Sequence, residues 1–159
     1  MTPTFFLRSV AQPIESHVGS FVHRRQLVIE WGYCDPAGIV FNSRFFEIFD
    51  TCTWALFEAA LGVPRQQLSS TFDIVGVPLV DARARFLAPV KFGDTVELES
   101  QVSAMRRSSF DIAHRLLAGG ELAAEGQETR VWAAIDQSHP AGIRAKELPP
   151  DVRARLLGE

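Results

Sequence analysis

One uninterrupted apolar segment constrains the fold of this chain more than any other feature. Residues 42–61 read NSRFFEIFDTCTWALFEAAL and contain neither glycine nor proline. On a helix, the apolar side chains of this segment cover most of the circumference. The polar side chains form only a narrow stripe, made of Arg44, Glu47, Thr51 and Glu58. A helix of this kind is surrounded by other structure, so we expect it at the centre of the fold.

The flanking residues predict where this helix begins and ends. Asn42 or Ser43 can cap its start, because a short side-chain oxygen accepts a hydrogen bond from a free backbone N–H. Gly62 follows its end and tolerates the left-handed conformation that a helix terminus often requires.

The charged residue Asp50 lies away from the polar stripe, with Phe46 and Trp54 one helical turn away on either side. A carboxylate on an apolar face needs a partner or a function, which makes Asp50 a candidate site residue. The plainer alternative is a helical aspartate that reaches solvent or caps a neighbouring loop.

Length and composition indicate one domain with a substantial core, since 47% of the 159 residues are hydrophobic. The formal net charge is −3 without runs of like charge, which disfavours nucleic-acid and membrane surfaces. Cys34 and Cys52 fit neither a metal site nor a disulfide framework. The apolar patch at residues 5–7 is too short for a signal peptide or a membrane span. We therefore expect a cytoplasmic protein without a metal or other cofactor.

Strand patterns lie on both sides of the helix. Residues 22–31 alternate apolar and polar side chains and predict a strand. Residues 63–68 are typical of a loop with one helical turn. Residues 74–137 are strand-like, interrupted by a turn at 91–94 and by the hairpin signal Gly119-Gly120.

Successive strands with short turns predict an antiparallel meander that ends in a long strand over roughly 122–136. The simplest packing wraps a curved sheet of about five strands around the helix, an α+β architecture. Residues 21–138 would form this domain, preceded by a poorly ordered or loosely docked extension at 1–20. Residues 139–159 would form a peripheral tail with a short helix after Pro150. One helix cannot cover a long sheet completely, so we expect a homodimer, or a tetramer of such dimers.

The turn ahead of the helix carries a second functional signal. Residues 35–40 read DPAGIV, in which Pro36 disfavours a helical conformation for Asp35 and Gly38 permits a left-handed step. The Asp35 carboxylate is thereby displayed just upstream of a helix N-terminus. Free N–H groups and the positive end of the helix dipole suit an oxyanion at such a place. Taken alone, the same residues also describe an ordinary Asp-Pro turn.

The order of elements resembles the hot-dog fold, and the DPAGIV turn resembles the signature of the 4-hydroxybenzoyl-CoA thioesterase family. The similarity runs from about residue 22 to residue 135 and includes residues 31–32, 76–78 and 106–107. It implies hydrolysis of an aromatic acyl-CoA to the free acid and coenzyme A. It also implies that Asp35 is the catalytic carboxylate, acting as nucleophile or general base, and that the backbone N–H groups of Asn42 and Ser43 polarise the thioester carbonyl.

The resemblance further implies a role for residues outside the turn. Asp50 would meet the polar end of an aromatic acyl group, beside Phe41 and Trp54. The family's basic pair near the nucleotide matches Arg106 and Arg107, and Arg130 is a third candidate, because guanidinium groups pair with phosphate in two-pronged fashion. Each of these arginines is equally well explained as an exposed strand residue. Residues 41–44 lack the aromatic-rich, proline-containing sequence of the hydroxybenzoyl branch, which leaves the acyl specificity open.

Three alternatives stay open on these grounds. A thioesterase for short or medium aliphatic acyl-CoA would share the motif. A non-catalytic acyl-CoA-binding hot-dog protein would have no use for Asp35. A hot-dog hydratase or dehydratase would place a histidine with a carboxylate at its centre, and the turn offers no nearby histidine. His114 is instead expected to be a satisfied core or edge residue.

Overall fold

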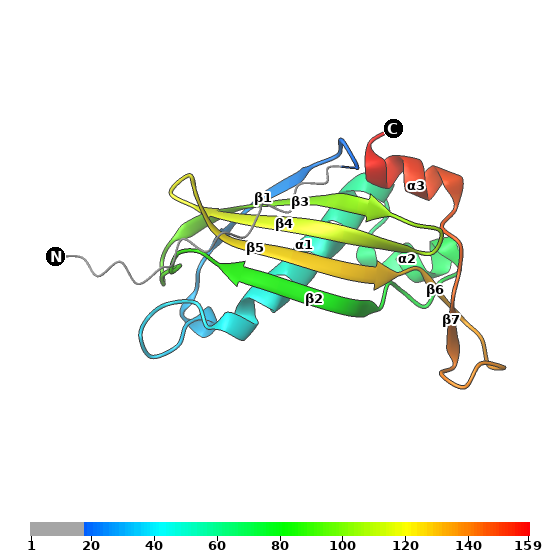
Figure 1. The fold of residues 1–159 in the computed structure, drawn as a ribbon, viewed down its shortest axis with the longest axis horizontal. Helices are drawn as coiled ribbons and strands as arrows, with labels where there is room; N and C mark the ends of the chain where they lie inside the picture. The colour runs from blue at the N-terminus through cyan, green and yellow to red at the C-terminus, as the bar shows by residue number, and fades with distance from the viewer. Residues whose placement is uncertain (1–17) are drawn as a thin grey trace.

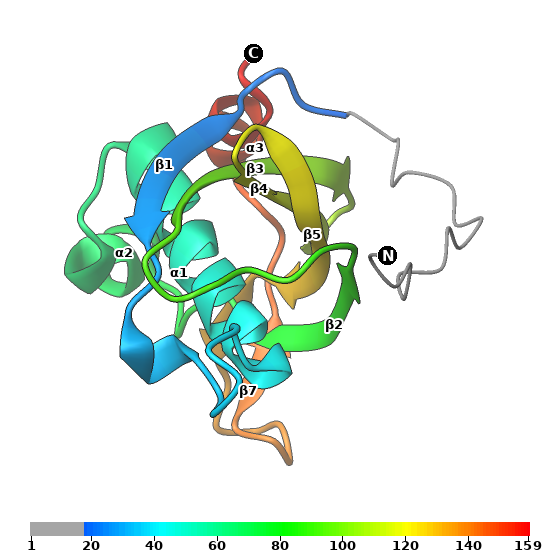
Figure 2. The same ribbon diagram turned by 90° about the vertical axis from the view of Figure 1, so that its left-hand side faces the viewer.

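A computed structural model describes residues 18–159 as a curved antiparallel sheet with α-helices packed against it. The five strands have the order β1-β3-β4-β5-β2. They are β1 (His23–Val28), β2 (Leu79–Phe86), β3 (Thr95–Met105), β4 (Ser109–Ala118) and β5 (Glu121–Val131). The sheet curves around the long helix α1 (Asn42–Leu61), as Figures 1 and 2 show. This is the predicted α+β architecture of the hot-dog fold.

The strand order differs from the simple meander predicted. Strands β3, β4 and β5 do follow one another, and the hairpin turn between β4 and β5 has φ angles of 60° at Gly119 and 80° at Gly120. Strand β2, however, pairs with β5 at the far edge of the sheet. The expectation of consecutive pairing was therefore wrong for β2. Alternation identifies which segments are strands, but contacts distant in sequence decide their neighbours.

Two predicted strands end earlier than expected. Strand β1 stops at Val28, and a short 3-10 helix, η1 (Trp31–Tyr33), replaces its predicted end. Trp31 is consequently exposed and packs edge-on against Phe92, with ring centroids 5.6 Å apart. The predicted last strand breaks at Trp132 into β5 and β6 (Ala133–Ile135). Strand β6 pairs with β7 (Ile143–Ala145) in a separate two-stranded sheet.

The central helix has the predicted length but not the predicted cap. Phe41 occupies the N-cap position in an extended conformation, and no side-chain capping bond is formed there. Asn42 and Ser43 are already helical, so the proposed caps were wrong. The end is as predicted, since Gly62 adopts a left-handed conformation with φ 67°. The following helix α2 (Arg65–Phe72) is longer than the single turn expected.

A glycine in the sheet permits the close approach of α1. The Phe49 ring stacks on His114, with centroids 5.0 Å apart and an interplanar angle of 10°. Strand β5 places Gly126 opposite His114, and a Cβ atom at Gly126 would lie 2.5 Å from the Phe49 ring. Any side chain at this position would therefore push the helix away from the sheet.

The C-terminal helix α3 (Pro150–Leu157) belongs to the core, although a peripheral position was predicted. Val152 and Leu156 are fully buried in the same apolar cluster as Leu56 of α1. The chain before β1 docks on this helix, since Ser20 N–H donates to Leu157 O at 2.7 Å. Residues 1–17 of the predicted extension lie outside the described residues. No helix in the described part of the chain is both long and apolar enough to cross a membrane.

Candidate active site

The Asp35 turn is closed by hydrogen bonds of its own backbone and side chain. Ala37 N–H donates to Asp35 Oδ1 at 2.8 Å, and Gly38 N–H donates to Asp35 O at 2.9 Å. Asp35 N–H donates to Ile39 O at 2.9 Å. Gly38 has φ 76°, a conformation that favours glycine. The Asp35 side chain is thus held by one oxygen, and Oδ2 has no hydrogen-bond partner among residues 18–159.

The turn delivers the chain directly to the start of α1. Phe41 N–H donates to Tyr33 O at 2.9 Å, and Arg44 N–H donates to Phe41 O at 2.9 Å. The N–H groups of Asn42 and Ser43, at the first two helical positions, have no acceptor within the described chain. The Asp35 carboxylate therefore lies on the short turn that leads into two free N–H groups and the positive end of the α1 dipole.

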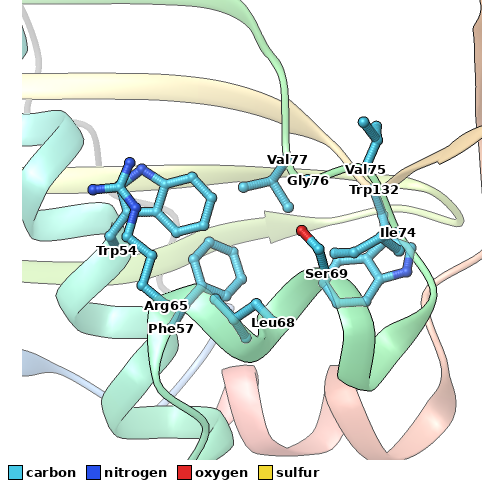
Figure 3. A pocket seen from close by; sticks show the side chains of 10 residues that line it. All are labelled: Trp54, Phe57, Arg65, Leu68, Ser69, Ile74, Val75, Gly76, Val77 and Trp132. Atoms are coloured by element: carbon cyan, nitrogen blue, oxygen red, sulfur yellow. The ribbon is translucent and has the colours of Figure 1, made fainter.

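Two adjoining cavities lie further along α1. The outer cavity, of about 390 Å³, is bordered by Asp50, Trp54 and Arg130. The inner cavity, of about 200 Å³, lies between α1, α2 and the residues before β2 (Figure 3). Five residues line both: Trp54, Arg65, Val75, Gly76 and Val77. Neither the Asp35 turn nor the first turn of α1 contributes to the lining that the described residues form.

Asp50 is paired rather than free. Its Oδ1 accepts a hydrogen bond from Arg130 Nη2 at 2.6 Å. Arg130 is only 3% exposed, and it also donates from Nε to Glu128 Oε2 at 2.8 Å and from Nη1 to Val77 O at 3.2 Å. Because its guanidinium makes these contacts inside the protein, Arg130 is less suited to binding coenzyme A phosphate than an exposed arginine. Its inward position on β5 is the physical reason.

A chain of buried polar contacts continues from Glu128 into the core. Thr53 Oγ1 donates to Glu128 Oε2 at 2.6 Å, and His114 Nε2 lies 3.6 Å from the same oxygen. His114 Nδ1 lies 2.8 Å from Ser100 Oγ. These contacts confirm that His114 is a satisfied core histidine. They also connect α1 with β3, β4 and β5 beneath the outer cavity.

The buried carboxylate of Glu128 is strongly acidic. Burial alone would raise its pKa, but the nearby His114 imidazole together with hydrogen bonds from Arg130 and Thr53 outweighs burial and lowers the pKa to about 2. Burial likewise opposes the charge of Arg130, yet hydrogen bonds and charge attraction from Glu128 and Asp50 raise the pKa of its guanidinium. The pair is therefore ionic inside the protein.

Known proteins are similar to this chain in sequence and fold. Residues 29–156 match the family model of the Thioesterase-like superfamily. The chain is 33% identical over 128 residues to 4-hydroxybenzoyl-CoA thioesterase of Pseudomonas sp. (strain CBS-3). The aligned region covers 77% of this chain and 89% of that protein. The chain belongs to the 4-hydroxybenzoyl-CoA thioesterase family. It is an enzyme of the thioester hydrolase class.

Solved structures of the family agree in fold. The three-dimensional structure of the Pseudomonas 4-hydroxybenzoyl-CoA thioesterase superposes with a TM-score of 0.76 at 30% identity, covering 84% of this chain and 98% of that one. A gentisyl-coenzyme A thioesterase superposes with a TM-score of 0.70 at 26% identity, covering 86% and 99%. A further relative, 1,4-dihydroxy-2-naphthoyl-CoA hydrolase of Synechococcus elongatus, is 33% identical over 91 residues, covering 57% of this chain and 66% of that protein.

The other residues predicted for the thioesterase site are spread over the molecule. Trp54 lines both cavities with Asp50 nearby, whereas Phe41 lies exposed at the start of α1 and lines neither cavity. Arg106 and Arg107 lie in the turn between β3 and β4, not in a strand as predicted. Arg106 forms an ion pair with Asp111, and the Arg107 side chain is 82% exposed.

Two site residues were missed by sequence reasoning. Arg65 begins α2, and no local pattern indicates that it borders the cavities. Glu128 did leave a signal, because it shares one face of β5 with Arg130, Gly126 and Ala124. Small apolar residues at every second position predict an inward face, and two charges that continue such a face indicate a buried pair.

The buried carboxylate generates a prediction about pH. The pKa of Glu128 falls from 4.5 to about 2 on folding, so its contribution to stability is complete above about pH 4.5 and is lost as the pH falls toward 2. Glu128→Gln should therefore be less stable at pH 7 and should lose less stability on acidification to pH 3, by up to about 2 kcal/mol. Urea unfolding between pH 7 and pH 3 measures both effects.

Glu47→Gln provides the matched control for this experiment, because Glu47 is exposed on α1 and forms an ion pair with Arg44 on the same helix. It should follow the wild-type acid dependence. The same acid dependence in all three proteins would show that Glu128 is not an ionised partner of Arg130.

Proposed function

We propose that this protein hydrolyses an aromatic acyl-CoA bearing a ring hydroxyl or amino group to the free acid and coenzyme A, with Asp35 as nucleophile or general base. The observation that carries the proposal is the Asp35 carboxylate, with one oxygen unpaired, on the turn that leads directly to the two unpaired N–H groups at the start of α1. Relatives named for 4-hydroxybenzoyl-CoA, gentisyl-CoA and 1,4-dihydroxy-2-naphthoyl-CoA support an aromatic substrate.

The chemistry requires charge stabilisation at the carbonyl oxygen. When a thioester carbonyl is attacked, negative charge develops on that oxygen. The N–H groups of Asn42 and Ser43 would donate to it, and the dipole of α1 favours the same charge. The free Oδ2 of Asp35 would attack the carbonyl carbon or remove a proton from water. Departure of the coenzyme A thiolate then completes the acyl transfer.

The acyl group would be selected by Asp50. Arg130 holds one carboxylate oxygen of Asp50, and the side chain borders the outer cavity. A carboxylate fixed in this way accepts hydrogen bonds and donates none, so it favours a ring hydroxyl or amine. An aliphatic acyl chain would give the Asp50–Arg130 ion pair no polar group to bind. This disfavours a thioesterase for aliphatic acyl-CoA.

A second chain would complete the site. The helical rise of about 1.5 Å per residue places Trp54 about 18 Å along α1 from Asn42, so the Asp35 turn and the cavities are far apart in one chain. At the β2 edge of the sheet, Leu79, Val80 and Phe86 are 47%, 60% and 41% exposed. We therefore propose that two chains pair along β2 and that each supplies its Asp35 turn to the partner's cavity.

The nucleotide would lie near the turn between β3 and β4. Arg106 and Arg107 project from this turn, and the exposed ion pair of Arg107 with Glu147 is weak enough to be exchanged for phosphate. Two adjacent guanidinium groups offer several donors to phosphate oxygens. We retain both arginines as the proposed phosphate ligands of coenzyme A.

Asp35→Asn tests the catalytic assignment. The asparagine preserves the shape of the turn but removes the nucleophile or base, so kcat should fall by about a hundredfold or more with little change in KM. Hydrolysis of hydroxybenzoyl-CoA followed by thiol release measures both constants. Asp73→Asn is the control, since Asp73 is exposed at the end of α2. Near wild-type turnover of Asp35→Asn would remove Asp35 from catalysis.

Asp50→Ala tests the substrate class. Loss of the acceptor should lower kcat/KM for hydroxybenzoyl-CoA by about tenfold or more relative to benzoyl-CoA, because charged hydrogen bonds contribute about 1.5–3 kcal/mol. Comparison of the two esters separates this effect from a structural one. A purely structural role of Asp50 would slow both esters equally and lower the melting temperature.

Mixed dimers test the composite site. Chains carrying Asp35→Asn and chains carrying Asp50→Ala should regain about a quarter of wild-type activity toward hydroxybenzoyl-CoA when they are unfolded and refolded together. Random pairing makes half of the dimers mixed, and one site in each mixed dimer has both residues intact. Activity equal to the mean of the separate variants would place both residues of a site in one chain.

A further inference from the structure

The orientation of the Asp50 carboxylate depends on one contact. Its side chain is 43% exposed, and the hydrogen bond that it forms within the described chain is the one from Arg130 Nη2 to Oδ1. An exposed carboxylate can otherwise adopt several rotamers. Whatever fixes Arg130 therefore also fixes the direction in which Asp50 presents its second oxygen at the outer cavity.

Arg130 is held at all three nitrogens of its guanidinium group. Nε donates to Glu128 Oε2 at 2.8 Å, Nη1 donates to Val77 O at 3.2 Å, and Nη2 donates to Asp50 Oδ1 at 2.6 Å. These acceptors come from β5, from the segment before β2 and from α1, so they hold the planar group in one orientation. Of the two carboxylates among them, Glu128 is the buried one, at 3% exposed.

Glu128 is in turn anchored to the helix that carries Asp50. Thr53 Oγ1 donates to Glu128 Oε2 at 2.6 Å, and Thr53 follows Asp50 by three residues on α1. Residues 128 and 130 share one face of β5, because alternate residues of a strand point the same way. With Arg130, these side chains close a ring of contacts between α1 and β5.

The charges in this ring are balanced in its buried part. Glu128 opposes the charge of Arg130 inside the protein, and it borders neither cavity in the described structure. One guanidinium thus meets two carboxylates, and the three groups together carry one net negative charge. That charge reaches the outer cavity on Asp50. Without the Glu128 charge, Arg130 would depend on Asp50 as its remaining counter-ion, because a buried charge without a partner is costly.

We infer that Glu128 is a positioning residue for the selection of the acyl group. It holds Arg130 in place and leaves the charge of Asp50 available to a hydroxyl or amine on the substrate ring. The inference rests on the proposed function, since it takes Asp50 as the acceptor for the acyl group. Part of the substrate preference is thereby determined by a side chain outside the cavity.

Glu128→Gln tests this role through substrate preference. The glutamine keeps nearly the same shape and removes the charge, so the ratio of kcat/KM for hydroxybenzoyl-CoA to that for benzoyl-CoA should fall by about tenfold. The loss should lie mainly in a raised KM for the hydroxyl ester, because the ring contact is made equally in the ground and transition states. Steady-state kinetics at pH 7, well below the melting temperature, measure both constants.

Two further variants separate positioning from packing. Val152→Ala lowers stability in the part of the core around α3, away from the ring of contacts, and should keep the wild-type ratio. Glu128→Asp retains the charge beside Arg130 and should recover part of the ratio. Loss of the ratio in Val152→Ala, or no recovery in Glu128→Asp, would assign Glu128 to packing alone and overturn the inference.

A double variant tests the route through Asp50. In Asp50→Ala the acceptor is already absent, so adding Glu128→Gln should change the ratio no further. A further loss would mean that Glu128 acts by another route, and the inference would fall.

A binding measurement separates this inference from the proposed hydrolysis. Free hydroxybenzoate and benzoate should quench tryptophan fluorescence, because Trp54 borders the outer cavity, and the wild type should bind hydroxybenzoate more tightly. Removal of this preference in Glu128→Gln would retain the inference even if neither ester were hydrolysed, which would reject only the proposed activity. The same preference in Glu128→Gln as in the wild type would overturn the inference alone.

Discussion

The enclosure of α1 by a curved sheet is the constraint on which the rest of the structure depends. The helix presents its N-terminal N–H groups beside Asp35, its middle at the ion pair of Asp50, and its second half at the cavity wall through Trp54. One rigid element thereby fixes how far the Asp35 turn lies from the cavities of the same chain. The contact of Phe49 with Gly126 sets how closely this element approaches the sheet.

Burial of charge is the second organising feature. Placing Glu128 and Arg130 in the core costs desolvation energy, and a buried ion pair is weak evidence for stability by itself. The pair is nevertheless fully bonded, since Thr53, His114 and Asp50 supply further contacts. The position of the pair explains why it is buried. The Arg130 guanidinium reaches from the core to the outer cavity and orients the Asp50 carboxylate there.

The sequence predicted the parts of the site that depend on near neighbours. Asp35 and Gly38 form the expected turn within a few residues, and Gly62 ends α1 because its own backbone adopts the left-handed conformation. Sequence-based prediction failed where contacts with residues distant in sequence determine the position of a side chain. Arg130 looks like an exposed phosphate ligand in isolation, but β5 turns it inward. The tail that contains α3 was predicted to be peripheral, but α1 and β3 pack against its apolar residues and bring the helix into the core.

The sequence by itself therefore determined the central helix, the Asp35 turn and the family, since periodicity and short-range backbone preferences act within one segment. Only the tertiary structure decided the order of β2 in the sheet, the pairing of Asp50 with Arg130, and the cavity beneath Trp54. These features join residues from α1, α2, β5 and the segment before β2. Their geometry arises from packing between segments distant in sequence, which no single segment specifies.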